Sequence, residues 1–523
     1  MNRLLRYSRI TVEAIIALLI TAVLVDYSMG AARIAGWLAR IQFLPACLAM
    51  SFGLVAFWLG ITIIFGRIYC STVCPMGALQ DLIARMPSFS RRKKPLRMRR
   101  DYTPPRTTLR YASLLIFVAC LFGTTFIASI IEPYTAYSRI AVYLLKPAYG
   151  SVGNLMAEAG EFTGLWTIAL VNVGIISAVG IIISTATLAA IAVMSVRHGR
   201  LFCNTLCPVG SALGLVSRYS IFHMDIDTDK CVQCRKCVRV CKAECIHMLD
   251  HVVDTSRCVV CFNCVDACDS NAITYTSRRK QLSIPMMQRI PPLGAPQGKV
   301  STSGADTATS PKASSPKLMD RRKFLSAGIV AAAAPAIAKA AEAATNRIDP
   351  LETGGVPLVP SRYVMPPGTR SRTDFLRHCT GCGLCISHCT SGVLRPATDQ
   401  YGRRHIMAPF MDFSHAWCYY NCNRCTTLCP TGALHQLTRD EKHRFVNGLA
   451  RVDAANCISA VEGTPCGACA RRCPTEAITM QKVNDQTNNV MPVVDPDKCI
   501  GCGACEYICP AAPYKAIVIN GNH

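Results

Sequence analysis

The chain has 523 residues, which is too long for one domain and suggests about three or four structural units. Its 56 Lys and Arg against 32 Asp and Glu give a formal net charge of +24, yet only 17% of the residues are charged and 51% are hydrophobic. A basic chain this apolar is typical of a membrane protein with basic loops and argues against a soluble nucleic-acid binder. The 31 cysteines are too many for a disulfide framework in a long chain with apolar spans, so we interpret them as metal ligands.

Four apolar windows are long enough for the bilayer, which a helix of about 20 residues can cross. They are Thr11–Tyr27, Ile41–Phe65, Tyr111–Ile131 and Trp166–Val196. Their length disfavours the alternative of buried core helices in a soluble protein, so the sequence predicts four spans. Eleven Lys and Arg lie between the second and third windows, whereas the two other loops hold four. The positive-inside rule therefore places the N-terminus, this basic loop and the residues after the fourth window in the cytoplasm.

The second and fourth windows end in the same phrase. Residues 66–77 (GRIYCSTVCPMG) and 199–210 (GRLFCNTLCPVG) are identical at seven of twelve positions. This internal repeat predicts two helical hairpins that are parallel repeats, related by an axis along the membrane normal. Cysteines four apart lie on one face of a helical turn, so four thiols could converge on a metal or cluster: Cys70, Cys74, Cys203 and Cys207. The alternative is that the Cys-Pro pairs serve packing and helix ends, and a stable disulfide is disfavoured in a reducing compartment.

Two four-cysteine runs follow the fourth window, each with the spacing Cys-x2-Cys-x2-Cys-x3-Cys. This is the spacing of bacterial two-cluster ferredoxins, in which the fourth cysteine of each run binds the cluster of the other run. The predicted ligand sets are Cys231, Cys234, Cys237 with Cys268, and Cys258, Cys261, Cys264 with Cys241. Lys242 and Asp269 replace the proline that usually follows the fourth cysteine, which leaves the local turn open but not the ligands. Zinc also binds repeated cysteine pairs, but two complete runs in tandem favour iron–sulfur clusters.

Four further runs occupy the C-terminal part of the chain. By the same crossing rule their sets are Cys379, Cys382, Cys385 with Cys429; Cys418, Cys422, Cys425 with Cys389; Cys457, Cys466, Cys469 with Cys509; and Cys499, Cys502, Cys505 with Cys473. Longer first spacings, x3 after Cys418 and x8 after Cys457, keep four thiolates, and pairing between other runs stays open. The sequence thus predicts six [4Fe-4S] clusters. Three cysteines remain, and we interpret them as bystanders: Cys47, Cys120 and Cys245.

A stretch rich in Pro, Ser, Thr and Gly, residues 278–318, is typical of a linker. The next segment, 319–345, begins with Arg321-Arg322-Lys323-Phe324-Leu325 and continues as a weakly apolar, Ala-rich run, which resembles a twin-arginine export signal. The segment is either cleaved near Ala338 or kept as a fifth span. The alternative is a cytoplasmic Ala-rich helix with a chance Arg pair.

The predicted fold class is a membrane α-helical bundle with α+β bacterial ferredoxin-like modules that bind two [4Fe-4S] clusters each. Residues 1–220 form the four-span domain with both Cys-x3-Cys-Pro phrases, and 221–277 form a cytoplasmic two-cluster module. After the linker and the twin-arginine segment, 346–523 form a module with four cluster motifs.

The chain resembles two protein families joined end to end. Residues 1 to about 280 resemble the NapH-type membrane subunit, with four spans, two Cys-x3-Cys-Pro phrases and a cytoplasmic two-cluster ferredoxin. Residues 319–523 resemble the NapG/MauM-type ferredoxin, with a twin-arginine signal and four cluster motifs. The resemblance implies a quinol dehydrogenase, which oxidises quinol in the membrane and passes electrons to a periplasmic reductase. The family's Cys-Pro phrases map onto Cys70, Cys74, Cys203 and Cys207.

The predicted function is that of a multi-pass protein of the bacterial inner membrane, an oxidoreductase component that passes electrons from menaquinol or ubiquinol to a periplasmic reductase or cytochrome. The N-terminus and first module are expected in the cytoplasm and the C-terminal module in the periplasm. No dinucleotide fingerprint or nucleophile setting is visible, so no catalytic residue is assigned. Glu132 and Asp26 are candidates to accept quinol protons, although we favour their interpretation as interfacial charges. The alternative function is an electron-donating assembly or reactivation factor for a periplasmic metalloenzyme.

Overall fold

The computed structural model describes residues 2–85, 101–123, 125–163, 177–277, 362–483 and 489–522. The chain divides into two compact units, Met1–Leu282 with Pro357–His523 as one and Ser283–Val356 as the other. All described residues belong to the first unit. The predicted linker and twin-arginine segment lie outside the described residues, as do residues 86–100, which hold most of the Lys and Arg of the basic loop.

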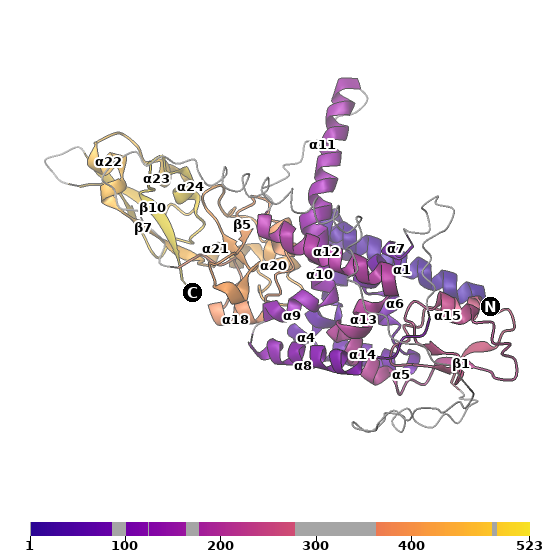
Figure 1. Ribbon diagram of the computed structural model, residues 1–523. Coiled ribbons are helices and arrows are strands. Elements are labelled where there is room, and N and C mark those ends of the chain that lie inside the picture. The colour runs from indigo at the N-terminus through magenta and orange to yellow at the C-terminus, as the bar shows by residue number, and fades with distance from the viewer. Residues whose placement is uncertain are drawn as a thin grey trace, which may run out of the picture. The chain divides into compact units, whose positions relative to one another are not determined.

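The N-terminal part of the first unit is helical (Figure 1). Its helices are α1 (Asn2–Val25), α2 (Gly30–Ala35), α3 (Trp37–Arg40), α4 (Phe43–Leu48), α5 (Phe52–Phe65), α6 (Tyr69–Thr72), α7 (Pro75–Ile83), α8 (Thr107–Gly123), α9 (Thr125–Ile131), α10 (Pro133–Ile140), the π-helix η2 (Ala141–Leu145), α11 (Lys146–Thr163), α12 (Ala178–His198), α13 (Leu201–Thr205) and α14 (Pro208–Ser217). Helices α7, α10 and α12 pack on one another, and α14 packs on α5 and α8. Apolar side chains from both halves of the repeat therefore share one core.

Among the described residues, two helices are long and apolar enough to cross a membrane: Leu4–Val25 within α1, and α12. They coincide with the first window and with the second half of the fourth, whose residues 166–176 lie outside the described residues. The second window, Ile41–Phe65, is not one helix, because α4 and α5 are separated by a turn in which Met50 has a φ of +52°. The third window contains most of α8 and all of α9, which lie on either side of residue 124, outside the described residues.

The first cysteine module is a small α+β fold, as predicted. Strand β1 (His223–Ile226) pairs antiparallel with β4 (Ile273–Thr276), and β2 (Ile246–His247) pairs antiparallel with β3 (Val252–Val253). The short helices α15 (Lys236–Val240) and α16 (Asn263–Asp266) each carry the third cysteine of a run. Strand residues such as Met224 and Ile273 fill the core between the two runs.

The second cysteine module repeats this architecture with more elements, drawn in orange to yellow in Figure 1. They are α18 (Arg372–His378), α19 (Leu384–Ser387), β5 (Leu394–Pro396), the 3-10 helix η4 (Arg403–His405), β6 (Pro409–Met411), α20 (Arg424–Leu428), α21 (Arg439–Arg444), β7 (Gly448–Val452), the 3-10 helix η5 (Ala454–Asn456), α22 (Ile458–Val461), α23 (Ala468–Arg472), β8 (Ile478–Lys482), β9 (Val490–Val494), α24 (Ala504–Ile508) and β10 (Ile517–Gly521). Three antiparallel pairs form, β5 with β6, β8 with β9, and β7 with the last strand, β10. The pairing of β7 with β10 closes the module around its last two runs.

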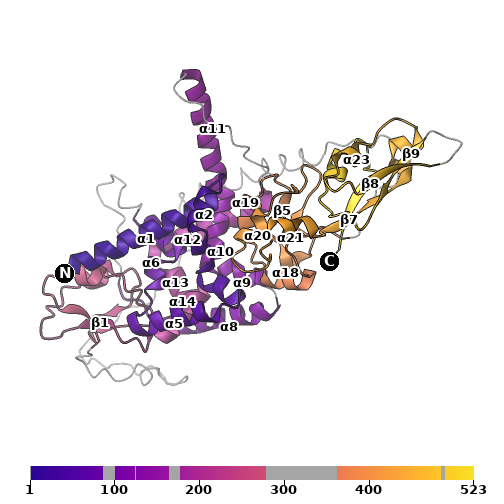
Figure 2. The ribbon, with the colours of Figure 1, turned by 180° about the vertical axis from the view of Figure 1, so that it is seen from behind.

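Helix α1 contacts both cysteine modules, through α16 of the first and α19 of the second. Near the start of α1, Arg6 forms an ion pair with Asp266. Just beyond its end, Lys146 donates hydrogen bonds to the carbonyls of Asp26, at 3.2 Å, and Ser387. Figure 2 shows α19 beside α2, the helix that follows α1. The two modules therefore lie against opposite ends of one helix of 24 residues.

Candidate functional site: groups of four cysteines

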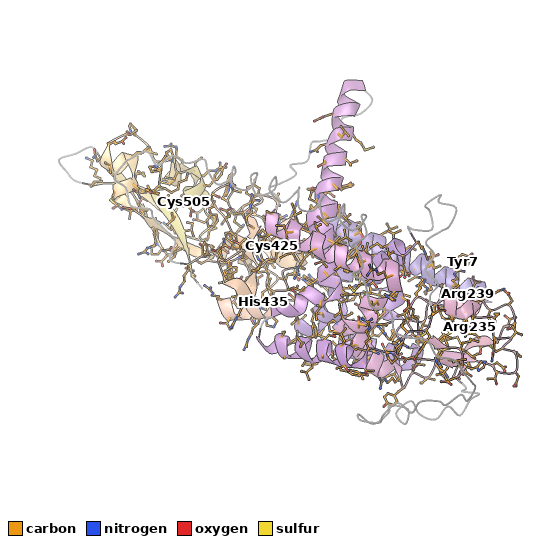
Figure 3. All side chains as sticks on the ribbon, viewed as in Figure 1. Tyr7, Arg235, Arg239, Cys425, His435 and Cys505 are labelled. Carbon is orange, nitrogen blue, oxygen red and sulfur yellow. The ribbon has the colours of Figure 1, made fainter. Side chains whose placement is uncertain are left out.

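Three cavities in the second module are each lined by four cysteines. One is lined by Cys457, Cys466, Cys469 and Cys509, a second by Cys473, Cys499, Cys502 and Cys505, and a third by Cys389, Cys418, Cys422 and Cys425. In each cavity three cysteines come from one run and the fourth from another, the combination that the crossing rule expects. Figure 3 shows Cys425 and Cys505, which belong to two of these groups. The rest of the lining is largely apolar, with residues such as Leu394 and Ile517.

The other cysteines of the six runs also lie in groups of four. In the second module, Cys429 lies within electrostatic range of Cys379, Cys382 and Cys385. In the first module, Cys237 lies near Cys231, Cys234 and Cys268. Cys264 lies near Cys258, Cys261 and Cys241. The cysteines of each predicted set thus lie near one another, and their assignment as cluster ligands stays a prediction.

The thiols of the cysteine groups are largely buried and accept backbone hydrogen bonds. Among the described residues, no three His, Cys, Asp or Glu side chains are close enough to hold one metal ion. Backbone amides point at the thiols, as when Ala477 N–H donates to Cys473 Sγ at 3.3 Å. Burial raises the pKa of Cys418 to about 12 and that of Cys469 to about 11, so iron replaces a proton when these thiols bind it.

The first module attaches to the helices at the position where a proline was expected. Lys242, which follows the fourth cysteine of its run, forms an ion pair with Asp81 of α7. Its carbonyl accepts a hydrogen bond from Arg200 N–H at 2.9 Å. The proline is replaced here by a side chain that joins the module to the helices. Nearby, the remaining thiol of Cys245 is buried, with its Sγ 3.7 Å from Cys241 Sγ.

The two Cys-x3-Cys-Pro phrases have the same local structure. Gly66 follows α5 and Gly199 follows α12, with φ of +74° and +64°, a conformation that glycine adopts freely at helix ends. Cys74 and Cys207 are the N-cap residues of α7 and α14, and in each case proline occupies the first helical position, where its missing N–H has no cost. The Cys-Pro pairs therefore begin helices α7 and α14, which is the alternative role considered for them. All four thiols of the phrases lie in one apolar core.

Each phrase also supplies an arginine to the other. Arg67 Nη2 donates to the carbonyl of Cys203 at 3.2 Å, and Arg200 Nη1 donates to the carbonyl of Cys70. Both side chains are almost fully buried. A glycine makes room for each, since a Cβ on Gly210 would lie only 2.8 Å from Arg67 Nη2. The two halves of the repeat are therefore interlocked.

The two arginines differ in their counter-charges. Arg200 forms ion pairs with two buried carboxylates, Glu13 at 3.0 Å and Asp81 at 2.9 Å. Arg67 has no carboxylate partner among the described residues, and its Nη2 lies 3.8 Å from Cys70 Sγ. A buried guanidinium is normally stabilised by a negatively charged partner. Arg67, which lies beside the thiols of the repeat, lacks such a carboxylate partner among the described residues.

The two carboxylates that were candidates for quinol protons have structural roles. Glu132 is only 1% exposed and caps α10, accepting a hydrogen bond from Tyr134 N–H at 3.0 Å. Helix capping therefore holds Glu132 in the protein core, and its interpretation as an interfacial charge stays a prediction. Asp26 accepts hydrogen bonds from the N–H groups of Ser28, at 2.7 Å, and Ala31, at 2.9 Å, and so organises the turn after α1.

Sequence reasoning missed the residues that seat the second module. Arg139 of α10 is buried and donates to the carbonyls of Thr380, at 2.8 Å, and Gly381, at 3.1 Å. Its neighbour Ser138 donates to the carbonyl of Cys382 at 2.8 Å. In the sequence, Arg139 is only one of the four cations in the two less basic loops. No local signal distinguishes it, because its partners lie more than 240 residues away along the chain.

Two domain families match the chain. Residues 48–97 and 173–226 match a family described as a 4Fe-4S binding domain, and these two segments contain the Cys-x3-Cys-Pro phrases. Residues 378–433 and 464–512 match a family described as a 4Fe-4S dicluster domain. The matches indicate that the protein carries multiple [4Fe-4S] clusters.

The curated relatives that the chain matches are ferredoxin-type proteins. The methylamine utilization ferredoxin-type protein MauM of Methylorubrum extorquens is 31% identical over 198 residues, which are 37% of this chain and 86% of the relative. MauM of Methylobacillus flagellatus is 32% identical over 158 residues, 29% of this chain and 66% of the relative. The ferredoxin-type protein NapG of Escherichia coli is 32% identical over 152 residues, 28% of this chain and 64% of the relative. No solved structure matches the chain. The chain is thus an iron–sulfur electron-transfer protein that belongs to the MauM family of ferredoxin-type proteins.

Proposed function

We propose that the protein is a membrane-bound electron conduit, which takes electrons from quinol and passes them to a periplasmic redox partner. It holds six [4Fe-4S] clusters on the six cysteine groups, two in the first module and four in the second. Such clusters supply one-electron carriers whose potentials depend on burial and on hydrogen bonds to sulfur. The chain contributes the thiol ligands, their enclosure, and a fixed position of each group relative to the helices.

The observation that carries this proposal is the contact of the two modules with opposite ends of α1. A helix of 24 residues is about 36 Å long, which exceeds the hydrocarbon core of about 30 Å. Arg6 attaches one module near the start of this helix, and Lys146 attaches the other just beyond its end. Redox groups at both ends of an apolar helix of membrane length suit a protein that links the two faces of a membrane.

The proposed topology has four spans, with the N-terminus and first module in the cytoplasm and the second module in the periplasm. It is supported by the basic loop between the second and third windows and by the Arg321-Arg322 segment. Quinol as the donor is supported by the NapH-type resemblance of the N-terminal part and by the similarity to NapG. The partner in this scheme is a reductase or cytochrome.

The topology is tested with a C-terminal tag in intact spheroplasts exposed to protease, with and without a working twin-arginine translocase. We expect cleavage of the tag only in cells with the translocase. Protection in both strains would place the second module in the cytoplasm and contradict the proposal. Iron analysis tests the clusters, since six cubes predict about 24 iron atoms per chain, four in each. A content near eight would contradict the six-cluster assignment.

Turnover separates the conduit from an electron-donating assembly factor. A conduit sustains steady oxidation of quinol when its terminal acceptor is present. An assembly or reactivation factor delivers few electrons per target molecule, and deletion of its gene leaves a periplasmic metalloenzyme without its metal centre. If steady quinol oxidation is absent and the metalloenzyme lacks its metal centre, the assembly factor is the correct function and the conduit is not.

We also propose that the Cys-x3-Cys-Pro thiols hold a further cluster, with Cys70, Cys74, Cys203 and Cys207 as ligands. Arg67 supports this site, because its buried charge lacks a carboxylate among the described residues and ligand thiolates would neutralise it. Replacement of Cys70 and Cys203 by serine is expected to lower the metal content of the purified chain. Cys47→Ser, in the same helical part but outside the phrases, is the control. Equal metal content in both variants would contradict the proposal.

A further inference from the structure

A lysine in the second module is buried without a partner. Lys442 lies on α21 and is only 1% exposed. The helix begins with a capping box, in which Thr438 and Glu441 exchange side-chain and backbone hydrogen bonds. The neighbouring His443 stacks on Tyr420, with ring centroids 3.9 Å apart. These contacts hold α21 in an orientation that buries Lys442.

The ammonium group of Lys442 has no hydrogen-bond partner. No carboxylate lies within ion-pair distance of it in the part of the chain that the structure describes. A buried, unpaired charge is strongly unfavourable, and lysine is almost never fully buried unless it is paired. A long aliphatic stem can fill a core, but it normally carries its charge to water. The burial of Lys442 therefore calls for negative charge close to its Nζ.

The neighbours of Lys442 are thiols from two different cysteine groups. Cys418 and Cys425 belong to the group completed by Cys389, and Cys502 belongs to the group completed by Cys473; Lys442 lies within electrostatic range of all three. The two loops are joined directly, because Cys418 N–H donates to the carbonyl of Cys502 at 2.9 Å. Lys442 thus lies near two cysteine groups, one in residues 378–433 and one in residues 464–512, the two segments that match the dicluster family.

We propose that Lys442 is the shared counter-cation of these two clusters and makes them neighbours in the electron path. This proposal rests on the proposed function, because it requires that both cysteine groups hold clusters. Cysteine-ligated cubes are anionic and become more so on reduction, so a fixed cation stabilises their reduced forms and raises their reduction potentials. An electron that passes between the two sites stays close to the same ammonium group.

The experiment is a potentiometric titration of the full-length protein, followed by electron paramagnetic resonance. Lys442→Met keeps the length and the apolar stem but removes the charge, and Lys442→Arg keeps the charge. Lys498→Met is the matched control, because Lys498 is exposed and pairs on the surface with Asp495. We expect two midpoint potentials to become more negative in Lys442→Met, and all of them to stay near wild type in Lys442→Arg and Lys498→Met.

Unchanged potentials in Lys442→Met would overturn the proposal, and so would a shift of the same size in the Lys498→Met control. If Lys442→Met loses iron, retention of iron in Lys442→Arg supports the role of charge. Loss of iron in both Lys442→Met and Lys442→Arg would mean that the packing of the lysine side chain matters rather than its charge. That result would also overturn the proposal. A wild-type protein without cluster signals would instead contradict the proposed function, so the two failures are distinguishable.

Discussion

The two cysteine modules meet the helices through the same part of a run, the loop between its first and third cysteines. In the first module this loop is 258–264, and Val260 packs on the glycine that ends α5. In the second module it is 379–385, and Gly383 lies against the π-helix η2. An arginine binds a backbone carbonyl at or beside each loop: Arg110 of α8 donates to Ser256, two residues before the first loop, and Arg139 of α10 donates to Thr380 within the second. Both modules thus use the first-to-third cysteine loop of one run for part of their attachment.

The loops share a backbone conformation but not their residues. The residue before the second cysteine has positive φ in both, Val260 at +50° and Gly381 at +62°, and so does the residue after it, Phe262 at +60° and Gly383 at +78°. Glycine adopts this conformation freely, whereas other residues lose roughly 1–2 kcal/mol there. In the first module the strain accompanies side-chain packing, such as Phe262 on Tyr275. The turn around the second cysteine has the same backbone conformation in both modules. The surface that packs on the turn determines whether glycine or a larger residue occupies it.

The largest expected effect comes from a side chain placed in a glycine loop. Gly501 of the second module occupies the same position as Val260, with a φ of +66°, and a Cβ there would lie 2.3 Å from Gly448 O. We expect Gly501→Val to destabilise the module by about 2–5 kcal/mol, through backbone strain and overpacking. The loss of at least one cluster, about four iron atoms, would appear in iron analysis. Val260→Gly relieves strain and is the control that keeps its iron; full iron in Gly501→Val would show that packing does not restrict this turn.

The attachment of each module is expected to depend on its own arginine. Arg139→Ala leaves the carbonyls of Thr380 and Gly381 without their donors, and each unsatisfied buried group costs about 1–3 kcal/mol. Arg110→Ala removes one of two donors to the carbonyl of Ser256, which accepts from Arg110 Nη2 at 2.9 Å and from Arg67 Nη1 at 3.0 Å, so its cost is expected to be smaller. Hydrogen exchange should become faster in 379–389 for the first variant and in 254–264 for the second. Faster exchange in both loops for either variant would mean that the two attachments are coupled.

The smallest effect is a gain in stability in the first module. Gln233 has a φ of +50° on an exposed loop, so Gln233→Gly removes backbone strain without opening a cavity. After the entropy that glycine adds to the unfolded chain, we expect a gain of about 0.5–1 kcal/mol, measured by chemical denaturation. Val232→Gly, at the exposed neighbouring position, should give no gain. Equal effects of the two substitutions would argue against strain at Gln233.

The cysteine groups were predictable because cluster binding needs thiols at fixed offsets, and spacing is visible in sequence. The crossing between runs follows from the same rule, and the structure places Cys509 beside Cys457 despite the long insertion in that run. The helical windows were less predictable, since hydropathy cannot detect the turn at Met50 that divides Ile41–Phe65. No feature of the sequence indicated that Lys442 is buried. It lies in a polar segment, Arg439–Arg444, whose composition is typical of an exposed helix, and only tertiary packing buries it.

The exchange of arginines between the repeat halves has a consequence for how such a fold arises. Arg67 reaches the cysteine carbonyl of the second half and Arg200 that of the first, so a single hairpin on its own would bury an arginine with nothing to bind. Two identical copies related by a two-fold axis would satisfy each other in the same way, because a contact from one copy is returned by the other. The reciprocal arginines are the pattern that a symmetric dimer would leave after fusion into one chain. The repeat is not symmetric in charge, since Arg200 pairs with Glu13 and Asp81 while Arg67 has no carboxylate partner among the described residues.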